Sequence, residues 1–459
     1  MKPKKQILWG TFILTAAGFL SRLIGFFYRI FLSHTIGAEE LGIYQLIFPV
    51  QALCLSLTVS GMSTAISRFA AGKAAVKDSK GAFDLFLTGT GFSFLFACIV
   101  SWFIREHAVL IAELFLQDSR TVPLLRLISW SLPLSALHTC VNAYFYSQKK
   151  TALPAASQLA EQIIRVATSF AAYTYLLSKG AQPSAWIAVI GIFVSELSVV
   201  IFCLVFLLGD QQKARRPLFP IHKPIESLRN LFSMYLPLTV NRLITTFLSS
   251  SEAILIPSRL VLWGHTAPEA LSIYGILTGM ALPLILFPNA VTNSVCVMLL
   301  PSIAQLQALD QKQKIRQAIE LTIQCCLLLG FSCTAFFAVF GNFLGSFLFH
   351  SQAAGAYIRI LAFVCPFLYL NAVLNSILNG LGKTGTCLLH NILGISLRLF
   401  CVIIIIPHYG IQGYLWGVLA SEVLTTTLHI IAVNRWISID FHLFSPKTLL
   451  NYLNSRKET

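Results

Sequence analysis

Three arginines lie where apolar helices would cross a membrane, and their chemistry suits an anionic ligand. Arg22 and Arg29 are seven residues apart, two helical turns, so both project from one face of the first predicted helix. An arginine at the centre of a spanning helix costs about 2.5 to 3.5 kcal/mol, so a polar partner is expected there. Guanidinium groups bind diphosphate oxygens bidentately and stay charged when partly desolvated. We predict that Arg22, Arg29 and Arg242 line a cleft for an anionic headgroup, with Arg29 snorkelling to the outer interface as the alternative.

Glu252 is the acidic residue best placed to assist such a cleft. It lies ten residues after Arg242, nearly three helical turns, and so faces roughly the same way. Its carboxylate could couple transport to a proton or another cation, and pairing with a neighbouring arginine is the alternative. We carry Glu252 forward as a candidate coupling residue.

The other charged residues inside predicted helices fit structural roles. Glu161 and Arg165 are four residues apart and are expected to form an ion pair within one helix. Arg398, the position that matches Arg165 later in the chain, has no acid at the same spacing and is expected to be unpaired. Glu196 and Glu422 follow a serine in matching segments, which favours a packing role for both.

No segment carries the motifs of a catalytic or metal-binding protein. A glycine-rich phosphate loop, a G-x-S-x-G elbow and an H-E-x-x-H pair are all absent from the sequence. The ten histidines are scattered without metal-ligand spacing, and the eleven cysteines fall inside predicted helices, where a thiol acts as a small apolar group. We predict no enzyme activity, no cofactor, no metal site and no disulfide framework.

The elements that must position these residues are membrane helices. The 459 residues are 56% hydrophobic and only 11% charged, against about 25% charged in a soluble domain. Apolar stretches of about 20 residues recur along the whole chain and favour helices over a barrel. The predicted spans cover residues 8–32, 42–66, 84–104, 122–146, 154–177, 185–208, 232–256, 272–300, 318–340, 357–380, 386–406 and 411–433.

The distribution of basic residues orients these twelve spans. With the N-terminus in the cytoplasm, 22 of the 33 Lys and Arg lie in loops on that side and 4 in loops on the other. This asymmetry follows the positive-inside rule and places both termini in the cytoplasm. The net charge of +15 therefore reflects topology, and nucleic-acid binding is not expected.

The sequence repeats itself at about half its length. A shift of 233 residues aligns Pro133 with Pro366, Asn142 with Asn375 and Arg165 with Arg398, and near the start of each half Arg22-Leu23-Ile24 matches Arg242-Leu243-Ile244. Each half crosses the membrane an even number of times, so the two repeats are parallel. We predict an all-α integral membrane fold of two six-helix repeats around a central cavity. Its parts are a lobe at 1–209, a basic cytoplasmic linker at 210–230, a second lobe at 231–433 and a polar cytoplasmic tail at 434–459.

Several segments resemble a known family. The stretch from Gly10 to Val50, above all Ser21 to Arg29, is similar to the stage V sporulation protein B branch of the polysaccharide exporter and lipid-precursor flippase superfamily, as are Pro237 to Leu260 and Leu378 to Gly385. The resemblance implies alternating access by two rocking lobes in the bacterial cell membrane. It further implies a polyprenyl-diphosphate-linked saccharide as substrate, a role in cell-wall, peptidoglycan or spore-cortex synthesis, and contact of Arg22 and Arg29 with the diphosphate.

One departure from that family concerns the lipid tail. Members commonly have fourteen helices, and in the peptidoglycan precursor flippases the last two help to form a groove for the lipid, whereas twelve spans are predicted here. A drug or cation antiporter of the same superfamily is the alternative function, although it would need carboxylates in its cavity and the first helix offers two arginines and no acid. The glycan, the coupling ion, the oligomeric state and a sporulation or vegetative role are left open.

Overall fold

The computed structural model describes residues 3–76, 78–213, 224–293, 296, 299, 303 and 311–436. Within these ranges every regular element is a helix. Eight helical stretches are long and apolar enough to cross a membrane. Two of them, Phe12–Ala75 and Thr384–Trp436, each contain two helices joined at a glycine, and α7 (Ala152–Ser178) and α9 (Pro224–Trp263) are further long helices. The described part therefore holds twelve long helical segments, and the predicted all-α membrane fold is confirmed.

By compactness the chain divides into unit 1, Met1–Met280, and unit 2, Ala281–Thr459. The predicted boundaries at residues 209 and 231 mark a sequence repeat, which is a different criterion from compactness, so they stay predictions. Residues 214–223 of the predicted linker and 437–459 of the predicted tail lie outside the described residues.

Unit 1 begins with two helices that form one long element. Helix α1 (Pro3–Leu55) is broken at Gly37, whose φ of 76° is a left-handed value that a residue without a Cβ adopts at little cost. The chain then runs through the π-helical segment η1 (Ser56–Ser60) into α2 (Gly61–Ala75). The glycine thus turns one apolar run into two of the predicted spans.

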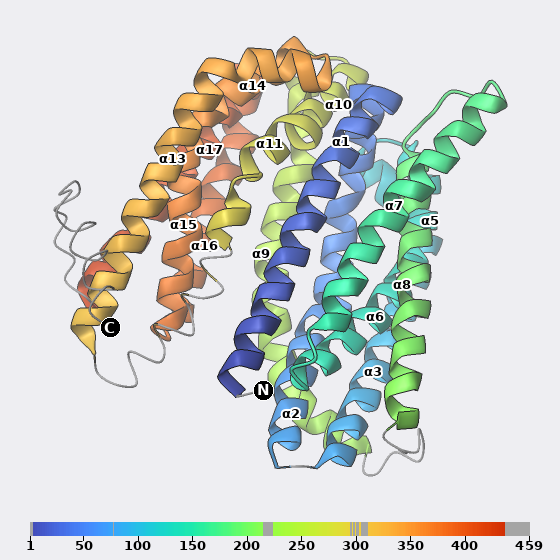
Figure 1. Cartoon of the computed structure of the whole chain (residues 1–459). Helices are drawn as coiled ribbons and strands as arrows, with labels where there is room; N and C mark the ends of the chain where they lie inside the picture. Colours follow the sequence, from blue (N-terminus) through green and yellow to red (C-terminus); the bar gives the residue numbers. More distant parts are fainter. Residues whose placement is uncertain are drawn as a thin grey trace. The chain divides into compact units, whose positions relative to one another are not determined.

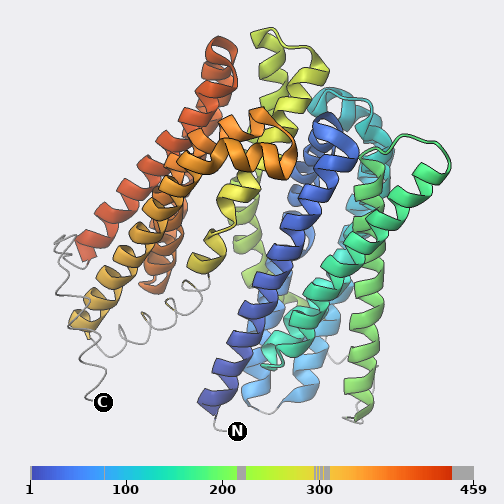
Figure 2. The same cartoon turned by 45° about the horizontal axis from the view of Figure 1, so that its top comes forward.

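The next seven helical elements complete the first half of the sequence. They are α3 (Ser79–Glu106), α4 (Ala108–Leu110), the π-helical η2 (Ile111–Leu116), α5 (Thr121–Ser129), α6 (Ser131–Ser147), α7 and α8 (Trp186–Lys213). Helix α7 packs against both α1 and α8, and the three run side by side (Figures 1 and 2). This arrangement brings residues far apart in sequence to the interior of one bundle.

Helix α3 starts at a polar cap outside the spans. Asp78 Oδ1 accepts a hydrogen bond from the Gly81 amide at 2.9 Å, and Lys73 Nζ lies 3.2 Å from its other oxygen. The amide bond and then the lysine lower the pKa of the Asp78 carboxyl, because both stabilise its charged form. An acceptor at this position satisfies an amide that has no partner within the helix.

Unit 1 ends with α9, α10 (Ala267–Gly275) and the π-helical η3 (Ile276–Ala281). Helix α10 packs closely on α1 because glycine faces glycine. A Cβ on Gly42 would lie 2.1 Å from the Leu271 carbonyl oxygen, and one on Gly275 would lie 2.1 Å from that of Ala38. Small residues let the two backbones approach, as is common between membrane helices.

Unit 2 is built in the same way from helices alone in its described part. Its elements are α11 (Leu282–Leu286), α13 (Lys312–Phe349), α14 (Gln352–Leu361), the 3₁₀ turn η4 (Ala362–Val364), α15 (Cys365–Gly380), α16 (Thr384–Phe400), the π-helical η5 (Cys401–Ile405) and α17 (Ile406–Trp436). Gly410 inside α17 has a φ of 63°, so this element too consists of two helices.

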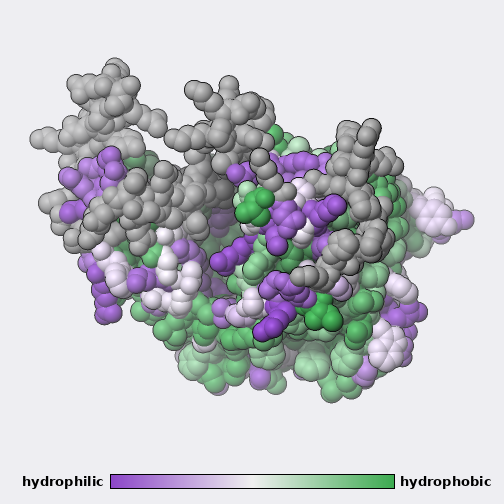
Figure 3. Space-filling view, turned by 90° about the horizontal axis from the view of Figure 1, so that it is seen from below, coloured by the Kyte–Doolittle hydropathy of each residue, from purple (hydrophilic) through white to green (hydrophobic). Residues whose placement is uncertain are grey.

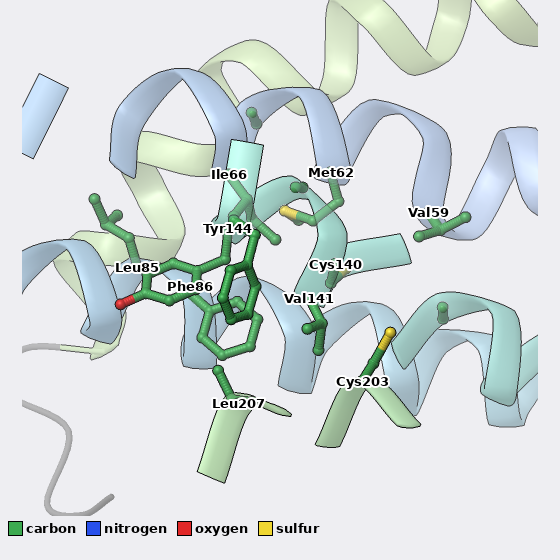
Figure 4. Packing of buried hydrophobic residues seen from close by; sticks show 14 of the residues in the cluster. Val59, Met62, Ile66, Leu85, Phe86, Cys140, Val141, Tyr144, Cys203 and Leu207 are labelled. Carbon is green, nitrogen blue, oxygen red and sulfur yellow. The ribbon is translucent and has the colours of Figure 1, made fainter. Parts of the chain in front are cut away.

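Each unit has its own apolar core. In unit 1 the aromatic rings of Phe86 and Tyr144 stack at 4.7 Å between centroids, beside Met62, Ile66 and Leu207 (Figure 4). In unit 2 the core lies between α13, α15 and α17 and includes Ile319, Val373, Ile377 and Val433. Large apolar side chains are nevertheless also exposed, and the space-filling view shows hydrophobic groups over the flanks and hydrophilic ones near the helix ends (Figure 3). An apolar flank of this extent fits a lipid environment.

Candidate functional site

Arg22 and Arg29 differ in their surroundings although both come from α1. Arg22 is exposed, and its guanidinium makes no hydrogen bond or ion pair with any residue that the structure describes. Arg29 is half-buried, and its Nη1 donates to the backbone carbonyl of Thr278 at 3.1 Å. Thr278 lies in η3, where a π-helical turn disturbs the regular ladder of backbone hydrogen bonds. Arg29 therefore fastens α1 to η3, and its binding of a ligand stays a prediction.

Arg242 resembles Arg22 in being exposed. It lies on α9, where its backbone carbonyl accepts a hydrogen bond from the Thr245 hydroxyl at 3.0 Å. Its guanidinium has no hydrogen-bonding or ionic partner among the described residues. The guanidinium groups of Arg22 and Arg242 are thus not engaged by described residues, and their binding of an anion stays a prediction.

An open cavity of about 380 Å³, with both apolar and polar lining residues, lies between α1, α9, α10 and η3. Most of its polar lining consists of hydroxyl groups, and the lining residues are Gln45, Phe48, Pro49, Ala52, Thr245, Thr246, Ser249, Ser250, Ala253, Tyr274 and Thr278. Gln45 is only 8% exposed, and its amide nitrogen has no hydrogen-bond acceptor in the described structure. A buried amide donor without an acceptor is costly, so this wall of the cavity suits a ligand with oxygen acceptors or a bound water.

Glu252 lies beside this cavity. It is 6% exposed, and its neighbours Ser250 and Ala253 line the cavity wall. Its carboxylate acts electrostatically on Tyr274, another lining residue. The structure therefore brings Glu252 and the Arg29 anchor at Thr278 to the borders of one cavity, while Arg22 and Arg242 are exposed away from its lining.

A second cavity, of about 590 Å³, lies between α2, α6 and α9. Its lining residues are Ser63, Thr64, Ser67, Arg68, Thr139, Asn142, Ala143, Tyr146 and Met234. Arg68 is one of the 22 basic residues assigned to cytoplasmic loops from the sequence, and this group of residues was not predicted. The signal was available, because Ser63 with Ser67 and Thr64 with Arg68 are four residues apart and form a polar stripe on one helix face.

Two buried ionic clusters complete the polar interior, one in each unit. In unit 1 the predicted ion pair of Glu161 with Arg165 is confirmed, and His138 Nδ1 lies 2.9 Å from Glu196 Oε2. In unit 2 Arg398 was expected to be unpaired, which is wrong, because its Nη1 lies 3.3 Å from Glu422 Oε1. The spacing rule failed there because the partner comes from α17, another helix.

The acidic side chains of Asp118 and Glu39 are engaged in ion pairs. Arg120 donates to Asp118 and to Glu39, at 2.8 Å and 2.6 Å. The hydrogen bonds that Arg120 donates to Asp118 raise the pKa of the Arg120 guanidinium above its ordinary value, and Glu39 adds to this effect. Carboxylates engaged in this way are poorly placed to act as general acids or bases.

The chain is similar to known proteins over most of its length. A family model described as polysaccharide biosynthesis protein matches residues 7–307, and a MatE model matches residues 237–404. Stage V sporulation protein B of Bacillus subtilis (strain 168) is 28% identical over 448 residues, which cover 96% of this chain and 86% of that protein. Lipid II flippase MurJ of the same organism is 21% identical over 472 residues, covering 97% and 86% respectively.

Solved structures agree on the fold. The inward-facing conformation of a multidrug resistance MATE family transporter of the MOP superfamily superposes with a TM-score of 0.71 at 14% identity, over 91% of this chain and 94% of that one. At this identity the likeness concerns the arrangement of helices, which is that of a MATE-type transporter.

Proposed function

We propose that this chain, which belongs to the polysaccharide biosynthesis protein family, moves a polyprenyl-diphosphate-linked saccharide across the bacterial cell membrane by alternating access. The coarser class is clear, since the chain is a multi-pass membrane protein whose relatives are flippases and transporters rather than enzymes. The name of one relative, lipid II flippase, supports a lipid-linked saccharide as the cargo.

The observation that carries this proposal is the pair of exposed guanidinium groups of Arg22 and Arg242. Neither has an ionic partner among the described residues, although both belong to apolar helices. Such groups are costly in a membrane unless they meet a polar or anionic partner or reach water, and a diphosphate offers the bidentate oxygens that arginine prefers. Arg29 adds positive charge near the cavity of α1, α9 and α10, whose hydroxyl and amide lining suits saccharide hydroxyls.

The proposal includes an orientation of the chain in the membrane. Both termini face the cytoplasm, because 22 Lys and Arg lie in loops on that side against 4 on the other. The headgroup would then start on the side where basic loops gather and leave on the outer side. Labelling of single cysteines placed in the loops of a cysteine-free variant tests this orientation, and reactivity of the termini from outside would contradict it.

The test is translocation of a fluorescent polyprenyl-diphosphate sugar in proteoliposomes. We expect Arg22→Ala and Arg242→Ala each to reduce the rate at least tenfold, because one charge-assisted contact to a phosphate contributes about 1.5–3 kcal/mol. Arg105→Ala is the matched control, since Arg105 is exposed at the end of α3 and stacks on Trp130 at 5.0 Å. Flipping that survives both arginine substitutions would contradict the proposal.

A drug or cation antiporter is the second candidate, favoured by the buried carboxylate of Glu252 beside the cavity. The assay that separates the two is exchange of an organic cation for protons in the same proteoliposomes. Exchange that Glu252→Gln abolishes, with no movement of the lipid-linked sugar, would establish the antiporter. If flipping occurs and Glu252→Gln slows it, Glu252 instead becomes the coupling residue of the flippase.

A further inference from the structure

Unit 1 contains a buried histidine and carboxylate that the proposed transport path does not use. His138 on α6 and Glu196 on α8 have side chains that are 13% and 8% exposed, with Nδ1 and Oε2 at 2.9 Å. Neither of these two atoms forms a well-aligned hydrogen bond in the described structure. The two groups therefore face each other closely, with no third group to neutralise them at that contact.

The charges around this pair do not balance without a proton. Glu161 and Arg165 on α7 form their own ion pair next to it, so two carboxylates face a single guanidinium. The other titratable groups near the cluster are Tyr28 and Tyr44 of α1, which act on Arg165, and Cys203 of α8, on which Glu196 acts. All three are neutral at ordinary pH. Arg29 of α1 also acts on Tyr44 but donates to the Thr278 carbonyl, so at the contact with Glu196 a proton shared with His138 is the group that cancels the remaining negative charge.

The repeat provides an internal reference for this reasoning. A shift of 233 residues carries His138 to Asn371, Arg165 to Arg398 and Glu161 to Gly394, while Ser195-Glu196 corresponds to Ser421-Glu422. In unit 2 Glu422 pairs with Arg398 at 3.3 Å and accepts from the Asn371 amide at 2.9 Å. One carboxylate faces one guanidinium there, so the equivalent cluster is balanced without a proton.

We propose that the His138–Glu196 pair is a proton-binding site of unit 1. One exchangeable proton neutralises the buried carboxylate there, as the permanent charge of Arg398 neutralises Glu422 in unit 2. An uncompensated charge inside a bundle is expensive, so the folded bundle holds this proton. The proton ties α6 to α8, and its loss leaves two carboxylates with one guanidinium between three packed helices. The inference concerns this bundle alone and is independent of the cargo.

The experiment rebuilds the unit 2 arrangement in unit 1. The double variant His138→Asn/Glu161→Gly removes the histidine and the second acid and frees Arg165 to pair with Glu196. We measure the thermal unfolding midpoint of the full-length protein in detergent from pH 5.5 to 8.5. The unfolding midpoint of the unaltered protein should fall as the pH rises above about 6.5, the reference pKa of histidine. This fall corresponds to a decrease of up to about tenfold per pH unit in the folding equilibrium constant. The double variant should lose this fall.

Two further variants keep the result interpretable. His429→Asn removes a buried histidine of unit 2, whose Nδ1 lies 2.7 Å from the Asn371 amide oxygen, and should leave the pH-dependent fall unchanged. Glu196→Gln removes the charge that retains the proton and should abolish the fall while keeping the shape of the side chain. If the double variant does not fold, Glu196→Gln decides alone. An unchanged fall in the double variant or in Glu196→Gln overturns the proposal.

Discussion

In unit 2 a buried carboxylate is paired with a guanidinium from a neighbouring helix, whereas in unit 1 the equivalent carboxylate faces an imidazole. The difference follows from two positions: Asn371 and Gly394 in unit 2 stand where His138 and Glu161 stand in unit 1. Because Glu161 pairs with the guanidinium of Arg165, His138 is the one close ionic partner of Glu196 among the residues that the structure describes. An acidic residue and a histidine at these two positions thus convert a cluster that is neutral without a proton into one that depends on a proton.

The largest effect is expected from Arg165→Met, which removes the one guanidinium of the unit 1 cluster. Two buried carboxylates then face one imidazole, and we expect a loss of about 3–5 kcal/mol of unfolding free energy at neutral pH. Denaturant unfolding in detergent at pH 5.5 and 7.5 measures it, and the loss should be smaller at the lower pH. Adding Glu161→Gln should restore most of the stability but leave it pH-dependent. A pH-independent double variant would break the comparison.

Arg398→Met tests the same logic in unit 2, where one carboxylate is left alone. We expect a loss near 3 kcal/mol in the same assay, because removing one partner exposes the buried charge of the other. Arg398→Met/Glu422→Gln should regain most of this loss and show equal stability at both pH values. A double variant as unstable as the single one would mean that packing, rather than charge, holds this cluster.

A smaller loss of stability is expected from Asn371→Ala, which tests the neutral residue that stands in unit 2 where His138 stands in unit 1. Asn371 donates to Glu422 at 2.9 Å and its amide oxygen lies 2.7 Å from His429 Nδ1. Leaving buried partners unsatisfied costs about 1–3 kcal/mol. Asn371→Asp keeps the size and is the matched control, and it should be worse than alanine because it adds a second carboxylate beside Glu422. Equal stability of the two variants would argue against a charge-balanced cluster.

The smallest effect is expected at Asp78, a carboxylate near the surface with which the buried carboxylates of both clusters can be compared. Loss of its cap in Asp78→Ala should cost about 1 kcal/mol, and Asp78→Asn should retain most of the capping. Its pKa is lowered in the folded protein, so its stabilisation is present above the unfolded value and is lost as the pH falls through about 4 and below. Unfolding of the alanine variant and the parent between pH 3.5 and 7 should therefore converge at the acidic end. A constant difference would show that the charge of Asp78 has no part in its effect.

The amino-acid sequence by itself determined the class of this protein, because a membrane span, or an ion pair within one helix, depends only on residues that are close together in the sequence. About 20 apolar residues suffice to identify a spanning helix, and a spacing of four residues suffices to predict the pair of Glu161 with Arg165. The spans, the repeat and the polar positions that it aligns could therefore be predicted. The family resemblance from Gly10 to Val50 agrees with the family model that matches residues 7–307.

Only the tertiary structure decided which polar groups meet across helices. Arg29 finds a carbonyl 249 positions later in η3, and Arg398 finds Glu422 on α17. Gln45 is recognised as an unpartnered donor only when α9 and α10 enclose it, and His138 meets Glu196 only because α6 packs on α8. The physical reason is that a helix fixes directions along its own axis, whereas contacts between helices depend on rotation and packing that no local spacing encodes.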